Sequence, residues 1–262
     1  MPQALTNNQI KIYSSLKQKK FRRQHGLFIA DGLHLVEAAL NSDWQVEAVL
    51  VASDKKDFFE DLNLTPSAMF VVPKARFTRI SPSRSAQGVL AIVKTRKTDG
   101  EIEQLVKSMR RIVVLDNVGD PGNVGTIIRT AVGFGYDLVI CLGNCAEIYN
   151  PKTIQATQGA LFKIPIIELK DECKFIELTK GHITTITFSV TGEVPLIDAP
   201  AFDRVALIFG GEVHGIAESI EAAADFRVRI EQTGAIDSLN VAIAAGIAMY
   251  KFREVKLSES SQ

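Results

Sequence analysis

Three short polar motifs, each following an apolar run, hold the residues of this sequence that could do chemistry. They are Asp120–Asn123 with Arg129 nearby, Gly210–Glu212, and Ser238–Asn240. Carboxylates and amides can hold and orient a reacting hydroxyl group, and an arginine can grip a phosphate through its planar set of donors. Such a combination is suited to positioning a polar substrate.

Each motif also has an ordinary structural explanation. Asn123 could cap a helix, Arg129 could be a surface residue whose stem lies along the helix, and the glycine pair could form a tight turn. Ser238 could cap the last helix, with Asn240 satisfying backbone donors in its first turn. No motif is specific alone.

Other common sites are excluded by spacing. The glycine pair is not followed by the Gly-Lys-Ser/Thr of a phosphate-binding loop, and it lacks the G-x-G-x-x-G spacing of a dinucleotide site. Cys141 and Cys145 have no partners at zinc-site spacing, and with Cys173 the cysteines are odd in number. We therefore expect no metal site and no disulfide framework.

The elements that position these motifs alternate between strand and helix after a polar linker at Thr95–Gly100, which places a domain boundary near residue 97. Such alternation predicts a largely parallel sheet covered by helices, with ligands at the carboxyl ends of its strands. The expected strands are Ile112–Leu115, Leu138–Leu142, Ile164–Ile167, Thr184–Ser189, Ala206–Phe209 and Phe226–Ile230, and the expected helices are Val124–Phe134, Thr153–Leu161 and Leu239–Phe252.

The first 97 residues predict a small α/β domain. A helix is expected over Leu33–Leu40, followed by strands over Val46–Val51, Met69–Val72 and Val89–Val93. The net charge of the whole chain is zero, yet residues 1–30 carry only basic charges: Lys11, Lys17, Lys19, Lys20, Arg22 and Arg23. This basic segment is a candidate grip on an RNA backbone, and a solvated terminal helix explains it almost as well.

Location is also suggested by the sequence. The chain has no signal-peptide core and no run of 18 apolar residues, so we expect a cytoplasmic protein without a membrane span.

Taken together and in this order, the motifs resemble those of the SpoU, or TrmH-like, RNA ribose methyltransferases of the SPOUT superfamily. The segments Asn150–Lys152 and Ala156–Phe162 are similar to two further stretches of that family, and the basic run into Gly26–Gly32 is similar to its substrate-binding domain. The resemblance covers nearly the whole chain.

The resemblance implies a small α/β RNA-binding domain over residues 1–97 and a knotted (trefoil-knot) SPOUT methyltransferase domain over 98–262. It implies methylation of a ribose 2′-hydroxyl in structured RNA with S-adenosylmethionine, no metal, and a homodimer in which Arg129 and the cofactor can come from different subunits. The implied catalytic residues are Asn123, Arg129, Glu212, Ser238 and Asn240. The implied cofactor contacts are the backbones of Gly210, Gly211, Ile230, Ile236 and Leu239, and the candidate RNA contacts are Lys19, Lys20, Arg22 and Arg23.

The family suggests Arg129 as a base, but a guanidinium stays protonated at neutral pH, so we favour a role in orienting the substrate and stabilising the developing alkoxide. The chain departs from the family at Glu231-Gln232, where a proline and its neighbour are usual, and at Asp31, where glutamate is usual. His214 is at a variable position, so we expect no catalytic role. By analogy with the family, the extra N-terminal domain favours ribosomal RNA. Transfer RNA methylation and non-catalytic RNA binding are the alternatives.

Overall fold

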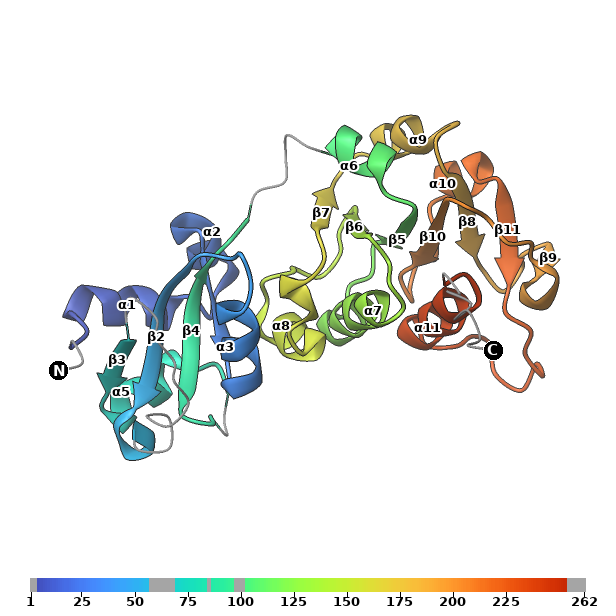
Figure 1. The fold of residues 1–262 in the computed structure, drawn as a ribbon. Coiled ribbons are helices and arrows are strands. Elements are labelled where there is room, and N and C mark those ends of the chain that lie inside the picture. The colour runs from blue at the N-terminus through green and yellow to red at the C-terminus, as the bar shows by residue number, and fades with distance from the viewer. Residues whose placement is uncertain (1–3, 57–68, 84–85, 97–101, 254–262) are drawn as a thin grey trace, which may run out of the picture. The chain divides into compact units, whose positions relative to one another are not determined.

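The computed structural model describes residues 4–56, 69–83, 86–96 and 102–253. It divides into two compact units, each described here by itself (Figure 1). The first unit comprises Met1–Lys97 with Glu147–Lys163, and the second comprises Thr98–Ala146 with Ile164–Gln262. The last four residues of the expected linker, 97–100, lie outside the described residues.

The first unit is built on a four-stranded sheet with the order β1-β4-β2-β3. Strand β4 is antiparallel to both of its neighbours, whereas β2 and β3 are parallel. The strands are β1 (Leu27–Asp31), β2 (Val46–Ala52), β3 (Met69–Val72) and β4 (Val89–Lys94). The helices are α1 (Asn7–Ser15), α2 (Lys19–His25), α3 (Leu33–Leu40), α5 (Lys74–Ile80) and α8 (Pro151–Thr157), with short 3-10 turns at η1 (Ser53–Lys55) and η2 (Ala160–Phe162).

Segment 147–163 joins this unit through aromatic packing. The ring of Phe28 on β1 stacks on Tyr149 at 4.9 Å and on Phe162 at 6.3 Å between centroids. Trp44 meets Phe162 edge to face at 5.4 Å. Such aromatic pairs add about 0.5–1.5 kcal/mol each beyond area burial. A segment distant in sequence is therefore part of the core of this unit.

The second unit is built on a seven-stranded sheet with the order β7-β6-β5-β10-β8-β11-β9, in which all paired strands are parallel. The strands are β5 (Arg111–Asp116), β6 (Leu138–Leu142), β7 (Ile166–Leu169), β8 (Thr184–Phe188), β9 (Val194–Pro195), β10 (Val205–Gly210) and β11 (Phe226–Arg229). The helices are α6 (Ile102–Ser108), α7 (Pro121–Gly133), α9 (Glu172–Thr179), α10 (Glu218–Ala223) and α11 (Val241–Lys251), with a 3-10 turn at η3 (Leu196–Asp198). The prediction of an α/β fold with a parallel sheet is confirmed.

Apolar residues explain the placement of the central strands. Every residue of β5 is buried, and so are all of β10 except its last residue, Gly210, as expected for parallel strands covered on both faces. These two strands are neighbours although they are far apart in the sequence, with Leu115 opposite Phe209. Their carboxyl ends therefore bring the first two polar motifs together.

Helix α11 packs against α7 through its small residues. Ala242, Ala245 and Ala248 are buried, and a Cβ added at Gly246 would lie 3.9 Å from Cγ2 of Thr130 on α7. Among the described residues, no helix is long and apolar enough to cross a membrane.

Candidate active site

The first motif forms the turn between β5 and α7. Asp120 is the N-cap of α7, because its Oδ1 accepts the backbone N–H of Asn123 at 2.8 Å, and Pro121 occupies the first turn. The prediction that Asn123 could cap this helix is therefore wrong. Its side chain is left available for other partners.

The second motif needs glycine because two backbones come very close. A Cβ on Gly210 would lie 2.2 Å from the carbonyl carbon of Gly215, and one on Gly211 would lie 2.3 Å from the oxygen of Asn117. The N–H of Gly211 donates to the carbonyl of Asp116 at 2.8 Å. These contacts join the turn after β10 to the turn after β5.

The third motif begins α11 at Asn240 and not at Ser238. The Oδ1 of Asn240 accepts the backbone N–H of Ala242 at 2.9 Å and that of Ile243 at 3.4 Å. The suggested capping role of Ser238 is wrong, and its side chain lines a cavity instead. The capping bonds use the Asn240 oxygen, which leaves its NH₂ group free to donate elsewhere.

Three of the predicted catalytic side chains form one hydrogen-bonded cluster. Asn123 Nδ2 donates to Glu212 Oε1 at 2.8 Å. Asn240 Nδ2 donates to Asn123 Oδ1 at 3.1 Å and to Glu212 Oε1 at 3.3 Å. Glu212 thus receives two amide donors, and its carboxylate is held at the point where all three motifs meet.

Asp116, the last residue of β5, is buried next to the turns that carry this cluster. Its carboxylate is 0% exposed, accepts the N–H of Ala217 at 2.8 Å and accepts Asn117 Nδ2 at 2.7 Å. Burial raises the pKa of Asp116, and the hydrogen bond from Ala217 partly opposes that rise. The residue ties the turn after β5 to the segment that leads into α10.

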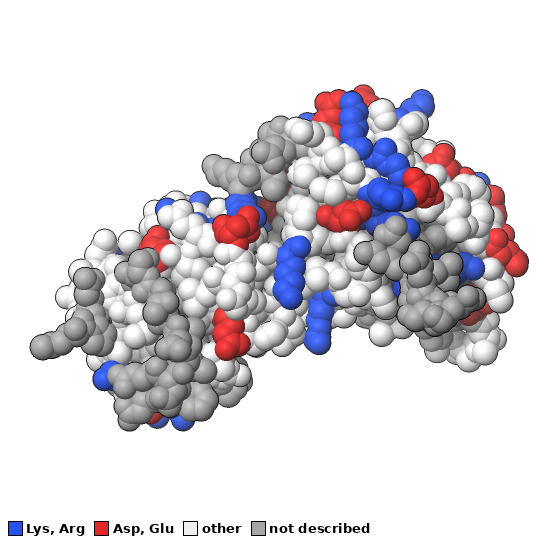
Figure 2. Space-filling model, viewed as in Figure 1, with Lys and Arg blue, Asp and Glu red and all other residues white. Residues whose placement is uncertain are grey.

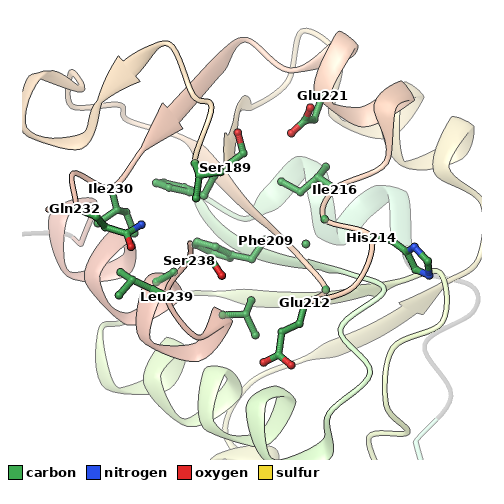
Figure 3. A pocket seen from close by; sticks show the side chains of 17 residues that line it. Ser189, Phe209, Glu212, His214, Ile216, Glu221, Ile230, Gln232, Ser238 and Leu239 are labelled. Carbon is green, nitrogen blue, oxygen red and sulfur yellow. The ribbon is translucent and has the colours of Figure 1, made fainter. Parts of the chain in front are cut away.

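A cavity of about 420 Å³ lies beside the cluster (Figure 3). Of the predicted residues, six line it: Gly210, Gly211, Glu212, Ile230, Ser238 and Leu239. Its apolar walls include Phe188 and Phe209, whose rings stack at 4.8 Å. Volume and lining are typical of small-molecule sites, which span roughly 300–1,000 Å³.

Sequence reasoning missed part of this lining. Ser189 follows the end of β8 and Glu221 belongs to α10, whereas Gln232, two residues after Ile230, is one of the departures that the sequence did single out. The strand-end rule could have found Ser189, whereas nothing in the pattern marked Glu221. Ile236 is not among the lining residues, and 59% of it is exposed.

A second cavity, of about 260 Å³, is lined by Asn117, Val118, Gly119, Asp120, Asn123, Glu212, Val213 and His214. Glu212 and His214 line both cavities. The cluster therefore borders two cavities that meet at Glu212, so one carboxylate is within reach of both.

Arg129 is not part of the cluster. It lies on α7, seven residues after Gly122 and three after the exposed Thr126, so it shares their face of the helix. Its side chain is exposed and makes no hydrogen bond or ion pair with the described residues. A free guanidinium on this face is available to a phosphate.

The basic segment divides into exposed and buried members. Lys19, Lys20 and Arg23 are exposed on α2. Arg22 is 3% exposed, forms an ion pair with Glu147, and donates through Nη1 to the carbonyl of Leu16 at 2.8 Å. Its guanidinium has no free surface for RNA, so its assignment as an RNA contact is corrected to a structural role.

Charge elsewhere is mixed. On the face drawn in Figure 2, acidic and basic side chains are interspersed, in keeping with a net charge of zero. Within the described residues, no group of three or more His, Cys, Asp or Glu side chains could hold a metal ion. Cys141 is buried, Cys145 half-buried and Cys173 exposed, and all are free.

Comparisons with known proteins identify the family of the chain. Residues 110–250 match the model of the SpoU rRNA Methylase family, and residues 7–91 match the MRM3-like substrate binding domain. The 23S rRNA (guanosine(2553)-2′-O)-methyltransferase RlmP of Bacillus subtilis is 30% identical over 94% of this chain and 96% of its own.

Two solved structures are similar over nearly the whole chain. The AdoMet-bound rRNA methyltransferase from Sinorhizobium meliloti is 28% identical, with a TM-score of 0.81 over 95% of each chain. A putative RNA methyltransferase of the TrmH family from Porphyromonas gingivalis is also 28% identical, with a TM-score of 0.81 over 96% of this chain and 99% of that one. The chain therefore belongs to the SpoU rRNA Methylase family.

Proposed function

We propose that this protein transfers the methyl group of S-adenosylmethionine to a ribose 2′-hydroxyl of ribosomal RNA. The observation that carries the proposal is the Asn123–Glu212–Asn240 cluster, whose Glu212 lines two cavities. The relative from Bacillus subtilis is named for 2′-O-methylation of 23S rRNA, and the Sinorhizobium meliloti structure is described as bound to AdoMet.

The larger cavity fits the cofactor. Phe188, Phe209, Ile230 and Leu239 supply apolar walls for an adenosine, and the side-chain-free backbone of Gly210 and Gly211 allows close approach. When bound, S-adenosylmethionine supplies an already activated methyl group on a sulfonium. The main task of the protein is then to align the attacking oxygen, and positioning of this kind is the largest expected contribution.

The smaller cavity would receive the target nucleotide. Its wall is formed by the turn after β5 and by Glu212–His214, so a ribose placed there would lie against Asn123 and Glu212 of the cluster. Glu212, held by two amide donors, can accept a hydrogen bond from the 2′-hydroxyl and orient it. Ser238 would complete the polar wall of the cofactor cavity.

Arg129 would bind the phosphate beside the target ribose and stabilise the alkoxide as it develops, because a guanidinium is a bidentate donor and a poor base. The exposed and unpaired state of its side chain is the support for this role. Arg129→Lys keeps the charge but loses the planar fork, so we expect it to lower the rate strongly. A near-full rate in the lysine variant would contradict bidentate binding.

The two units would have different functions. We assign RNA binding to residues 1–97 and catalysis to residues 98–262, apart from segment 147–163, which belongs to the first unit; the two family matches at 7–91 and 110–250 support this division. Lys19, Lys20 and Arg23 are the retained candidates for phosphate contacts. The trefoil knot of the family is part of the same proposal, supported by the family match over residues 110–250.

We also propose a homodimer that uses the exposed face of α11. Ile243, Ile247 and Tyr250 lie four and three residues apart, share one helix face and are 56%, 40% and 56% exposed. An apolar stripe of this size is stabilised by burial, and a second copy of the chain is the expected partner. Sedimentation of Ile243→Lys should show a monomer where the wild type sediments as a dimer.

The first experiment is titration calorimetry of the purified protein with S-adenosylmethionine and with S-adenosylhomocysteine, followed by methyl transfer to ribosomal RNA and mapping of 2′-O-methyl positions. We expect micromolar binding and modification at one nucleotide. Absence of binding with and without RNA, in folded protein, would contradict the enzymatic function and favour non-catalytic RNA binding.

A further inference from the structure

The side chains of Glu231 and Gln232 lie in different environments. Glu231 Oε1 accepts the N–H of Ile197 at 3.3 Å, and Glu231 does not line the cofactor cavity. Hydrogen bonds from its own backbone N–H, from Ile197 and from Leu196 lower the pKa of Glu231, so its carboxylate is held ionised at the η3 turn. The carboxylate is therefore occupied outside the cavity.

Gln232, by contrast, lines the cavity beside Ile230 (Figure 3). In that view it lies on the side of the cavity away from Glu212 and His214. Its amide makes no hydrogen bond with any of the described residues, and the neighbouring Ile230 and Leu239 present apolar surface. An amide with a free donor and a free acceptor thus borders an apolar part of the cavity.

This placement restricts which part of the cofactor can lie there. The methyl group must approach the cluster at Glu212, on the far side of the cavity. Adenine has two apolar faces and an edge on which an amino donor stands next to a ring-nitrogen acceptor. A primary amide matches such an edge with two hydrogen bonds, as asparagine and glutamine do when they bind adenine in DNA. An amide can also bond to the charged amino-acid end of the cofactor, but that end has no apolar face to pack on Ile230 and Leu239, whereas adenine has two.

We propose that Gln232 recognises the adenine ring of the cofactor by a two-point hydrogen bond, with Ile230 and Leu239 packed against the ring. This inference depends on the proposed function, because it assigns one part of S-adenosylmethionine to one side of its cavity. Gln232 would then determine specificity for the cofactor. The adjacent Glu231 would have a structural role, because its carboxylate bonds to the η3 turn.

The test is calorimetry with two ligands and three proteins. The ligands are S-adenosylhomocysteine and its analogue in which the 6-amino group is replaced by hydrogen. The proteins are the wild type, Gln232→Leu, which keeps the volume but loses the amide, and Glu231→Gln as the matched neighbouring control. Removing a bidentate hydrogen bond to a base costs about 1–3 kcal/mol, or roughly five- to 150-fold in affinity.

We expect Gln232→Leu to weaken S-adenosylhomocysteine binding by about tenfold or more within that range. The wild type should prefer S-adenosylhomocysteine to the analogue, Gln232→Leu should lose that preference, and Glu231→Gln should keep it. Thermal melting of each variant shows whether it is folded.

An equal preference for the amino-bearing ligand in wild type and Gln232→Leu would overturn the inference and leave the proposed function standing. Failure of the folded wild type to bind S-adenosylhomocysteine at all, in the presence or absence of RNA, would overturn both.

Discussion

The two units of this protein use their polar side chains in opposite ways. In the first unit, Arg22 forms an ion pair with Glu147, and Asp31 accepts a hydrogen bond from Ser81. The side chains of both pairs are largely shielded from solvent. In the second unit, Asn123, Glu212 and Asn240 are bonded to one another, and Asn123 and Glu212 also line a cavity. Polar groups of the first kind hold the fold together, whereas those of the second kind stay accessible to reactants.

The contrast shows why residue type alone does not distinguish structure from function. Arg22 and Arg129 are both arginines within or near a recognisable motif, yet one is buried in an ion pair and the other is exposed without a partner among the described residues. The difference lies in the partner: Glu147 comes from a segment that packs into the first unit from far along the chain.

The largest expected effect is on the buried ion pair. Glu147→Ala leaves the charge of Arg22 buried without a partner, which should lower the free energy of unfolding of the first unit by about 3–5 kcal/mol. Urea denaturation, with hydrogen exchange of β1 as the local probe, measures this. Cofactor affinity should not change, because only second-unit residues line that cavity.

The matched control for the ion pair is Arg22→Met with Glu147→Leu, which removes both charges and should restore most of the stability. If Glu147→Ala unfolds at the same urea concentration as the wild type, the buried pair does not stabilise the first unit, and the comparison between the units fails.

The next effect concerns Asp116, the buried support of the site. Asp116→Ala leaves the N–H of Ala217 without its acceptor and should cost about 1–3 kcal/mol, whereas Asp116→Asn keeps an oxygen and should cost less. Guanidinium denaturation of both variants provides the measurement, and equal losses in the two variants would argue against this hydrogen bond.

Asp116 should also make stability depend on pH. Because burial raises its pKa in the folded state, the folded protein holds the proton more tightly than the unfolded chain does. Its contribution to stability is greatest below the ordinary value of 3.8 and falls as the pH rises through the raised folded value. Asp116→Asn should flatten that fall, and an unchanged pH profile would show that another group causes it.

A smaller effect on stability separates the two functions of Asn240. Asn240→Ala loses both the cap of α11 and the amide donors, so it should cost about 1 kcal/mol of stability. Asn240→Asp keeps a capping oxygen but loses the NH₂ group that reaches Asn123 and Glu212. Methyl transfer should fall roughly ten- to a hundredfold in both variants. Full transfer by Asn240→Asp would remove the amide donors from the mechanism.

The smallest effect per residue is expected in the exposed basic residues of the first unit. Replacing Lys19, Lys20 and Arg23 by glutamine should reduce the slope of log affinity against log salt for RNA by about 0.7–0.9 for each phosphate that is no longer neutralised. Filter binding at several salt concentrations measures the slope. Lys180→Gln, at an exposed lysine of the second unit, is the control, and an equal reduction there would contradict a local grip.

The sequence predicted the elements best where apolar residues repeat regularly. The helix Leu33–Leu40 and the strands Met69–Val72 and Leu138–Leu142 have the predicted bounds. Helix α7 begins earlier than predicted, at Pro121, because Asp120 caps a first turn that has no apolar repeat. Helix α8 ends early, at Thr157, because Gln158 takes a left-handed conformation with φ 47°. Residues other than glycine seldom adopt this conformation, so the sequence does not predict a helix end at a glutamine.

The sequence predicted which residues belong to the site better than it predicted how they are arranged. The motifs identified Asn123, Glu212 and Asn240, which the fold brings together. They could not show that the NH₂ group of Asn240 reaches Asn123 and Glu212, nor that Arg22 is buried, because both depend on partners far away in the sequence. The place of Gln232 in the cavity likewise depends on the path of one loop.

The pairing of β5 with β10 has a consequence for how the protein is made. Leu115 pairs with Phe209, and Asn240, which completes the cluster, comes later still. During synthesis from the N-terminus, the cluster cannot assemble until α11 has been made, and long-range parallel pairing folds slowly. A nascent or truncated chain therefore has no competent site, so binding of the cofactor would report that the whole second unit has finished folding.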